Sequence, residues 1–431
     1  MVPPQSLILF MNRSFWPDVE ATGQFLTELC EELAEDYLIL VIAGRSHFVK
    51  EDHFKPWRFF REEVYKNIRI LRVRHSRFWK GNFIGRILNW FTYSLLAFIA
   101  AWRVKPRLIV ACTDPPFLGI ISLFFRKVRG IPFILNCRDL YPDAAVELGK
   151  LEKGLLSGLF DFFNRRVFNQ AELVIPLGQS MEARIRAKGA SAGQIKVIPD
   201  WADTSAIQPV SKKDNPLLEK FGLKEKFVIM YSGNIGLSQD FSPILHSVSR
   251  MREDSSWFLV FVGEGMGKRS LVDEVRSCHL TNVLFLPYQP WEMLSFSLGM
   301  ADLHLVPLKR GMAGASVPSK VYGIMAAGRP YLAITDRESE PARLALEFRC
   351  GLWAEPGDLE KISYEIQWAL NHRVELEEMG KRARSLATSQ FAKDVVIKEW
   401  FKALKKVAAG EKSFGALRDG IFCSARSHRE G

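Results

Sequence analysis

Short apolar runs alternate with amphipathic stretches along most of the chain. The runs are rich in β-branched and aromatic residues, which predicts strands. Between them, apolar residues spaced three and four apart predict helices, for example over 21–34, 83–103 and 154–169. Strands that alternate with helices are typical of βαβ units, so we expect an α/β fold with parallel sheets covered on both faces. The predicted strands are 6–11, 38–43, 68–73, 108–112, 132–136, 173–176, 196–198, 227–231, 258–262, 283–286, 303–306 and 331–334.

One polar, proline-containing segment interrupts this alternation. We interpret it as a linker at 201–225 between two doubly wound, Rossmann-like domains that face a cleft, one at 1–200 and one at 226–390. A helical segment follows at 391–408. The tail at 409–431 is rich in Gly, Ser and Arg without periodicity, and we expect it to be mobile. In such sheets ligands bind at the carboxyl ends of the strands, where helix N-termini offer free N–H groups.

Four loops of small residues follow strands at places where an anion could bind. The loop with Gly23 opens the first helix, although a glycine there equally serves to cap a helix. The other three lie in the second domain, at 232–236, 263–269 and 314–320. Their spaced glycines match neither a Walker A motif nor a full dinucleotide fingerprint. Three such loops at helix N-termini of one domain predict a diphosphate site.

Two charged residues are candidates for catalysis. Lys320 stands in the first turn of a predicted helix, where the helix dipole disfavours a cation by roughly 0.3–1 kcal/mol and a bound anion removes the conflict. The alternative is a solvated lysine that extends outward. Asp139 ends a buried-looking strand, and we expect it either to face the cleft as an acid–base group or to cap a turn. His304 lies in an apolar strand and is expected in the core or at its edge.

Signatures of several other chemistries are missing from the sequence. It contains no Asp-x-Asp pair, no Cys/His cluster of zinc spacing, and no Gly-x-Ser-x-Gly, His-Glu-x-x-His or cysteine-nucleophile motif. We therefore expect neither a metal nor a cofactor. The six cysteines are scattered, which favours a reducing, cytosolic compartment.

Composition and charge narrow the class of protein. The 431 residues are 48% hydrophobic and 25% charged, which excludes disordered and fibrous classes. The net charge is +11, and residues 55–130 alone hold 16 Lys and Arg against three acidic residues. The longest apolar run, at 95–102, has eight residues, whereas a bilayer span needs about 20. We therefore expect no transmembrane helix, and the first five residues indicate no signal peptide.

Aromatic residues are interleaved with the positive charge between residues 54 and 102. This pattern occurs in nucleic-acid-binding proteins, but no helix-turn-helix, zinc or RNA-binding motif accompanies it. It equally suits a surface on anionic lipid, where each Lys or Arg contributes around 1 kcal/mol. The alternative is a helix packed in the core, which we expect at least for residues 95–101. The candidate acceptor- and membrane-contacting residues are Trp57, Arg72, Arg74, Arg77, Trp79, Arg86 and Trp90.

The order of several motifs resembles that in family-4 retaining glycosyltransferases of the GT-B fold. The motifs are Tyr-Ser-Gly-Asn-Ile-Gly at 231–236, Val-Gly-Glu-Gly at 262–265, Pro-Ser-Lys at 318–320 and Met-Ala-Ala-Gly-Arg-Pro at 325–330. The segments 139–142 and 199–203 resemble a branch of bacterial surface-polysaccharide enzymes that includes fucosamine transferases. The resemblance covers about residues 5–405.

The resemblance implies that the second domain binds a nucleotide-sugar donor and that the first binds the acceptor. It also implies that the segment 286–288 meets the base, that Gly23 approaches the donor phosphate, and that the last helix crosses back to the first domain. Together with the loops, it gives as donor-binding candidates Gly23, Gly233, Asn234, Gly236, Gly263, Gly265, Lys268, Pro287, Tyr288, Ser319 and Lys320. The catalytic candidates are Asp139 and Lys320.

The sequence departs from the family pattern at two places. Many relatives carry an Arg and a Lys five residues apart after the first strand of the second domain, and here these positions are Asn234 and Gln239. Relatives also carry a Glu-x7-Glu pair whose second member holds the ribose. Here those positions are Ala315 and Gly323, so the usual ribose contact is missing.

The charge of a departing diphosphate must then be met by other groups. We expect Lys320, with Lys268 or Arg269, to neutralise it, because a positioned cation at developing charge dominates such transfers. The alternative is an inactive copy. The expected function is retaining, metal-independent transfer of an acetamido sugar from a UDP-linked donor to a lipid-linked saccharide in surface polysaccharide biosynthesis. The protein is expected in the cytoplasm, peripheral on the inner face of an anionic membrane, without nucleic acid. A nucleotide-sugar epimerase and a non-catalytic membrane-associated assembly factor remain open.

Overall fold

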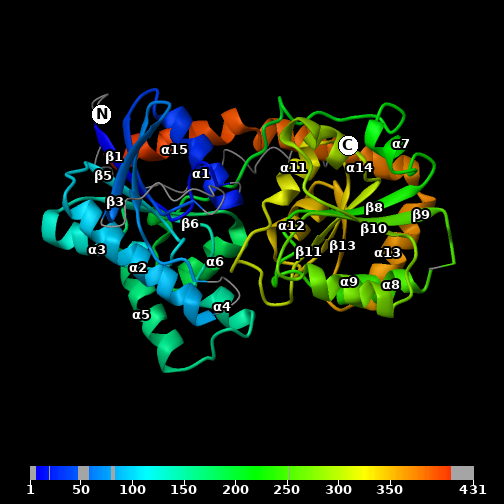
Figure 1. The fold of residues 1–431 in the computed structure, drawn as a ribbon, viewed down its shortest axis with the longest axis horizontal. Helices are drawn as coiled ribbons and strands as arrows, with labels where there is room; N and C mark the ends of the chain where they lie inside the picture. Colours follow the sequence, from blue (N-terminus) through cyan, green and yellow to red (C-terminus); the bar gives the residue numbers. More distant parts are fainter. Residues whose placement is uncertain (1–5, 19, 47–57, 79–82, 252, 409–431) are drawn as a thin grey trace, which may run out of the picture. The chain divides into compact units, whose positions relative to one another are not determined.

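The chain divides into two compact units, each built around one β-sheet (Figure 1). The structure, a computed structural model, describes residues 6–18, 20–46, 58–78, 83–251 and 253–408. Unit 1 comprises the chain up to Pro199 and the segment that begins at Ile397, and unit 2 comprises Asp200–Val396.

Unit 1 contains a seven-stranded sheet. Its strands are β1 (Leu7–Met11), β2 (Leu38–Ala43), β3 (Phe60–Tyr65), β4 (Ile68–Val73), β5 (Leu108–Cys112), β6 (Phe133–Cys137) and β7 (Leu173–Pro176). They lie in the order β3-β4-β2-β1-β5-β6-β7, and all pairs are parallel except β3 with β4 at one edge. The strands β5, β6 and β7 are buried along their whole length, as expected where helices cover both faces.

Helices cover both faces of this sheet. On one face lie α2 (Phe83–Trp102), α3 (Leu118–Arg129) and α5 (Leu155–Gln170), and on the other lie α1 (Ala21–Leu33) and the part of α15 (Lys393–Ala408) that belongs to unit 1 (Figure 1). The arrangement follows from right-handed crossovers, because the connections through α2, α3 and α5 cross the sheet in one direction and that through α1 in the other. Three shorter helices complete the unit: α4 (Asp143–Glu147), α6 (Gln179–Ala187) and the 3₁₀ helix η1 (Ala192–Gln194).

Unit 2 contains a six-stranded sheet, parallel throughout. Its strands are β8 (Phe227–Ser232), β9 (Trp257–Val262), β10 (Val283–Leu286), β11 (Leu303–Pro307), β12 (Tyr331–Ile334) and β13 (Gly351–Ala354), in the order β10-β9-β8-β11-β12-β13. The order reverses between β8 and β11, the position where doubly wound sheets bind ligands.

The helices of unit 2 also lie on both faces of its sheet. On one face are α8 (Ser242–Ser249), α9 (Lys268–Ser277) and α13 (Leu359–Asn371); on the other are α11 (Lys320–Ala326) and α14 (Arg373–Gln390) (Figure 1). The remaining helices are α7 (Pro216–Lys220), the 3₁₀ helix η2 (Trp291–Met293), α10 (Leu294–Gly299) and α12 (Glu340–Glu347). Large aromatic residues fill the core between these layers, including Tyr231, Trp257, Tyr322 and Tyr331.

The predicted strands agree closely with the observed ones. Eleven of the twelve are present, with each end within one residue of the prediction. The strand predicted at 196–198 is wrong: Lys196 and Ile198 donate backbone hydrogen bonds to Val174 and Pro176 of β7, but the only bridge is an isolated one at the preceding residue, Ile195. The strands β3 and β13 were not predicted.

The segment 201–225, which its composition indicated to be a linker, packs into unit 2. Ile207, Leu217, Leu218 and Leu223 are all buried, and α7 forms within the segment. The Ala202 N–H also donates to the Phe391 carbonyl at 2.9 Å. The apolar residues of the segment therefore anchor it, together with the buried Asn215, while most of its other polar residues are exposed.

The helix α2 is long and apolar enough, by length and composition, to cross a membrane. This stretch, Ile84–Trp102, is the one candidate span among the described residues, and 44% of it is buried. No such helix was expected, because the longest uninterrupted apolar run is short. Isolated polar residues such as Asn89 and Thr92 interrupt the apolar run of α2 without adding charge. Here α2 packs on the sheet, with the Tyr93 hydroxyl donating to the Ile42 carbonyl at 2.8 Å.

Candidate functional site

The carboxyl edge of the unit 2 sheet is formed by neighbouring loops that bond to one another. The loop after β8 joins the loop after β9 through Gly233 N–H to Val262 O and Ile235 N–H to Glu264 O, both 2.9 Å. The Gly263 N–H donates in turn to the Leu286 carbonyl at 3.0 Å, at the end of β10. The adjacency follows from the sheet order, since β10, β9 and β8 are neighbours.

Two glycines are required by this packing itself. A Cβ on Gly263 would lie 2.1 Å from the Gly233 carbonyl oxygen, and a Cβ on Gly265 would lie 2.2 Å from the Ile235 carbonyl oxygen. Their φ angles, 143° and 155°, are also rarely adopted by other residues. The glycine spacing read from the sequence as a phosphate loop therefore has a structural cause, whether or not a phosphate binds there.

Lys320 is the first residue of α11, and its side chain reaches the end of β8. Its Nζ donates a hydrogen bond to the Tyr231 hydroxyl at 2.5 Å and lies 3.8 Å from the centroid of the Tyr231 ring. The Tyr231 hydroxyl donates to the Asn234 carbonyl, and a Cβ on Gly233 would lie 3.2 Å from Nζ. Lys320 therefore does not extend outward into solvent, which was the alternative that the sequence allowed.

No described carboxylate forms an ion pair with Lys320. Burial away from water disfavours the ammonium and lowers the pKa of Lys320 to about 7. Its site thus combines a half-buried cation, glycine-lined loops and an aromatic ring, and no carboxylate of the described residues pairs with the cation.

The other candidate cations at this edge are differently placed. Lys268 pairs with Glu264 at 2.6 Å, so its charge is already matched, and Arg269 is exposed. Gln239, at a position where the resemblance implies a Lys, accepts the Gly236 N–H at 2.9 Å and holds the loop after β8. Asn234 is exposed.

The remaining donor-binding candidates lie along the same edge. Tyr288 is 53% exposed, and its ring would lie 3.4 Å from a Cβ on Gly263, so it covers the loop after β9. Pro287 is exposed beside it, and the half-buried Ser319 directly precedes Lys320. Ala315 is buried, which leaves no carboxylate where relatives carry the first Glu.

His304 is a core residue, as expected. It is fully buried, and its Nε2 lies 2.9 Å from the Leu298 carbonyl. Burial, with repulsion from the nearby Arg329 and Lys320, lowers the pKa of His304 to about 4, so the ring stays neutral near pH 7. In the part of the chain that the structure describes, no group of three or more His, Cys, Asp or Glu residues could hold a metal, and the five cysteines there are free.

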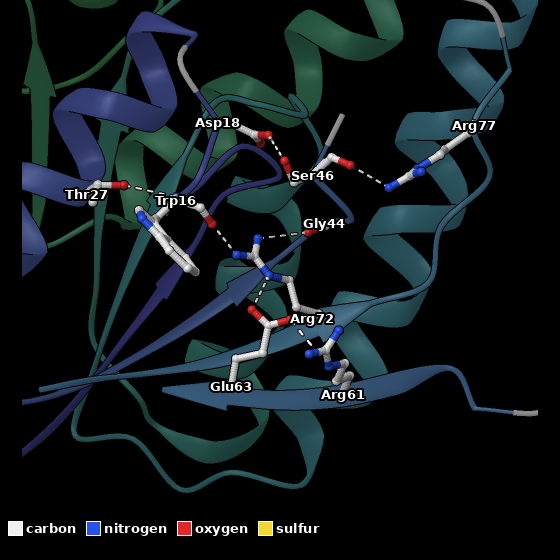
Figure 2. A network of polar contacts seen from close by, with 9 residues as sticks. All are labelled: Trp16, Asp18, Thr27, Gly44, Ser46, Arg61, Glu63, Arg72 and Arg77. Atoms are coloured by element: carbon white, nitrogen blue, oxygen red, sulfur yellow. Dashed lines mark hydrogen bonds and ion pairs between the residues drawn. The ribbon is translucent and has the colours of Figure 1, made fainter. Parts of the chain in front are cut away.

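Charged side chains near the carboxyl edge of the unit 1 sheet pair with one another. Arg13 binds both carboxylate oxygens of Asp114, at 3.2 and 3.1 Å. Figure 2 shows a second network around Arg72, whose guanidinium donates to Glu63 at 3.1 Å and to the carbonyls of Gly44 and Trp16. These contacts tie β3, β4, the end of β2 and the loop after β1 together.

Asp18 and Ser46 extend the network of Figure 2. The Ser46 hydroxyl donates to Asp18 at 2.6 Å, and burial raises the pKa of the Asp18 carboxyl. Arg77 donates to the Ser46 carbonyl from the far side. Sequence reasoning did not single out Asp18 or Ser46, because neither belongs to a recognisable motif.

The two unit 1 candidates from the sequence lie at the same edge. Asp139 is half-buried just after β6, and its N–H donates to the Thr113 hydroxyl at 3.1 Å. Gly23 is buried in the first turn of α1, where a Cβ would lie 3.4 Å from the Phe15 nitrogen and the Asp18 carbonyl. The loop 15–18 of its own chain therefore occupies the space beside Gly23.

The residues expected to contact acceptor or membrane differ in exposure. Arg72 is 3% exposed and Trp90 is 8% exposed, so neither can lie against a membrane, while their contact with an acceptor stays a prediction. Trp90 packs edge-on against Tyr141, with Arg86 over its ring. Arg74 and Arg86 are half-buried, Arg77 is exposed, and Trp57 and Trp79 lie outside the described residues.

Comparison with known families identifies both units. Residues 21–201 match the family described as "Glycosyl transferase 4-like domain", and residues 215–386 match "Glycosyl transferases group 1". The chain therefore consists of two glycosyltransferase domains. The first match falls within unit 1 apart from its last two residues, and the second falls within unit 2.

Two proteins resemble this glycosyltransferase along much of its length. WcaI from Escherichia coli, named for colanic acid biosynthesis, is 26% identical over 406 residues, which cover 90% of this chain and 99% of WcaI. WbjE from Pseudomonas aeruginosa, named a glycosyltransferase, is 26% identical over 313 residues, which cover 70% of this chain and 76% of WbjE.

Solved structures confirm the predicted GT-B fold class of this glycosyltransferase. Sucrose-phosphate synthase from Thermosynechococcus elongatus matches with a TM-score of 0.75 at 16% identity, covering 94% of this chain and 100% of the synthase. HepE from Anabaena, in complex with UDP and glucose, matches with a TM-score of 0.70 at 15% identity, covering 93% of this chain and 99% of HepE. WaaG, a glycosyltransferase involved in lipopolysaccharide biosynthesis, matches with a TM-score of 0.69 at 14% identity, covering 94% and 100%.

Proposed function

We propose that this glycosyltransferase moves an acetamido sugar from a UDP-linked donor to a hydroxyl of a lipid-linked saccharide, with retention of configuration and without a metal. Unit 2 would bind the donor and unit 1 the acceptor, at the cytoplasmic face of the membrane, in surface polysaccharide biosynthesis. The names of WcaI and WaaG, for colanic acid and lipopolysaccharide biosynthesis, support the product class, and the UDP in HepE supports the nucleotide.

The observation that carries the proposal is the environment of Lys320. Its half-buried ammonium lies beside Gly233 without a carboxylate partner among the described residues, and burial has lowered its pKa to about 7. A diphosphate supplies the negative charge that the protein does not, and its approach favours the protonated lysine. The negative charge on the diphosphate grows as the bond to the sugar breaks, so a cation fixed there stabilises the transition state more than the ground state.

Asp139 is the proposed catalytic carboxylate of the acceptor side. It follows β6 at the carboxyl edge of its sheet, where ligands of doubly wound sheets bind. The bonds from the Arg138 and Asp139 N–H groups to Thr113, at 3.0 and 3.1 Å, fix the backbone that carries it. A carboxylate on a fixed backbone can orient an acceptor hydroxyl or accept its proton.

The test combines the purified chain with a panel of UDP-, GDP- and TDP-linked sugars and a membrane extract that contains lipid-linked saccharides. The expected result is transfer of an acetamido sugar from a UDP donor, unaffected by EDTA, with the anomeric configuration retained in the NMR spectrum of the product. Absence of both transfer and nucleotide binding contradicts the proposal. Conversion of a free UDP-sugar without acceptor indicates an epimerase instead, and vesicle binding without any nucleotide binding indicates an assembly factor.

A further inference from the structure

The outer layer of unit 1, defined here as the solvent-facing sides of α2, α3 and α5, is unusually apolar. Twelve of the twenty-four exposed large hydrophobic residues in the described part of the chain lie on these three helices. They are Ile84, Leu88, Phe91, Leu95, Ile99 and Trp102 on α2, Phe124 and Val128 on α3, and Leu155, Leu156, Leu159 and Phe162 on α5. Soluble proteins do expose single apolar residues, but a group on adjacent helices marks a binding surface.

The helix α2 shows the feature most directly. Its residues Tyr93, Ala97 and Ala100 are fully buried against the sheet, while the six exposed residues recur every three or four positions along the opposite side. A helix that covers a sheet ordinarily presents polar residues to water on that side. The exposed stripe runs along nearly the whole 20-residue helix, about 30 Å, and packing within the unit does not account for it.

The three helices present their exposed sides in one direction. All lie on the same face of the sheet (Figure 1). The Phe124 ring of α3 lies 5.3 Å from Phe98 and 6.2 Å from Trp102 of α2, so these two helices touch. A Cβ on Gly119 of α3 would lie 2.8 Å from Val167 of α5, so the third helix is equally close.

The charge of this layer is predominantly positive. The sequences of α2 and α3 contain no acidic residue, and the one on α5, Asp161, is bound by Lys188 and Arg165. The exposed cations on these helices are Lys127 on α3 and Arg165 and Arg166 on α5; the exposed Arg103, Lys105 and Arg107 follow α2, and the exposed Glu152 precedes α5. Two arginines of these helices lie over aromatic rings of the same layer, the half-buried Arg129 4.0 Å from Trp102 and Arg166 4.2 Å from Phe162.

We propose that the outer layer of unit 1 docks on an anionic lipid bilayer, with α2 lying in the plane of the interface rather than crossing it. Apolar and aromatic side chains would enter the boundary of the acyl chains while the cations meet the headgroups. The inference deepens the proposed function, on which it rests for the presence of a lipid-linked acceptor. It also moves the membrane contact from the residues predicted by sequence to a different surface.

One feature favours a bilayer over a second copy of the chain, and another disfavours a helix that spans the bilayer. A symmetric dimer brings the same patch of each copy together, and here that would oppose two layers of like charge. Burial of Tyr93, Ala97 and Ala100 against the sheet also disfavours a spanning helix, because α2 would have to leave the core of unit 1 to cross the membrane.

Vesicle sedimentation of the full chain tests the proposal. Vesicles of phosphatidylcholine with and without phosphatidylglycerol are the probes, and binding to the anionic vesicles that weakens with salt is expected. The triple variant Leu88→Gln, Phe91→Gln, Leu95→Gln changes side chains that are 41, 58 and 50% exposed. It should reduce vesicle affinity about tenfold or more. Lys105→Gln with Lys127→Gln should reduce both the affinity and its salt dependence.

A matched variant on unit 2 serves as control. Leu346→Gln, Tyr364→Gln and Val374→Gln change side chains of similar exposure, 43, 57 and 71%, on α12, α13 and α14, and should leave vesicle binding unchanged. Thermal unfolding and the shift produced by UDP should be equal in all variants, which separates this inference from the proposed function.

Three results would overturn the inference. One is a wild-type chain that binds nucleotide but ignores anionic vesicles. Another is equal loss of vesicle binding in the control variant. The third is resistance to extraction from vesicles by alkaline carbonate, which would indicate that α2 spans the bilayer.

Discussion

The two units share a doubly wound plan but differ at the carboxyl edges of their sheets. In unit 1 the charges of that region pair within the protein, Arg13 with Asp114 and Arg72 with Glu63. In unit 2 the edge consists of glycine loops and Lys320, which has no described carboxylate partner. The same architecture thus balances its charge internally in one unit and leaves a positive charge for a ligand in the other. The side chains at the edge, and not the fold, determine which of these two arrangements a unit has.

Loss of the unmatched cation should have the largest effect. We expect Lys320→Ala to lower kcat/KM for the donor about a hundred- to a thousandfold, the size found when one group that stabilises developing charge is removed. Lys268→Ala is the matched control, because Lys268 already pairs with Glu264 and should change the rate only a few-fold. Full activity in Lys320→Ala would refute the relocation of charge onto this residue.

The glycine loops of unit 2 should tolerate side chains poorly. In Gly263→Ala the new methyl group would lie 2.1 Å from the Gly233 carbonyl oxygen at a φ of 143°, so we expect a loss of about 2–4 kcal/mol in unfolding free energy. Gly357→Ala also has a positive φ, 86°, but meets nothing within 4 Å, and should cost about 1 kcal/mol. Urea unfolding measures both, and equal stability of the two variants would contradict the packing argument.

The paired charges of unit 1 should matter for stability rather than for donor binding. Glu63→Gln leaves Arg72, whose side chain is 4% exposed, with a neutral partner, and we expect a loss of about 1–3 kcal/mol. Glu62→Gln changes the neighbouring residue, which is 77% exposed and 3.8 Å from Arg69, and should have no measurable effect. The affinity for UDP should be unchanged in both variants. A weaker affinity in Glu63→Gln would contradict the view that the edge of unit 1 does not serve donor binding.

The strands of both units could be predicted because buried parallel strands are continuous apolar runs. The strand β3 could not, since its sequence Phe-Arg-Glu-Glu-Val-Tyr is that of an edge strand, paired only with β4 and largely open to water. The burial of Arg72 was within reach of the sequence. Side chains alternate along a strand, and Arg72 shares a face of β4 with the buried Ile68 and Ile70.

The site was predicted in part. The place of Lys320 in the first turn of a helix follows from the residues around it, and the structure confirms that position. The contact between Lys320 and Tyr231 could not be predicted from the sequence. It depends on β8 and β11 being neighbours, and sheet order is set by tertiary packing. The role of Gly263 and Gly265 was also hidden, since a glycine pattern does not distinguish a loop that approaches a ligand from one that approaches another loop.

A pH dependence of donor binding is also expected, and it belongs to unit 2 alone. Burial lowers the pKa of Lys320 to about 7, so in the free protein the side chain is charged below pH 7 and neutral above it. A diphosphate binds best to the charged form, and its presence raises the pKa in the complex. The affinity for UDP should therefore fall about tenfold per pH unit above pH 7, until the pH reaches the pKa in the complex. Lys320→Arg keeps its charge throughout and should bind UDP without this dependence. Calorimetry between pH 6 and 9 measures both profiles, and a flat profile for the wild-type chain would show that Lys320 does not titrate in response to the donor.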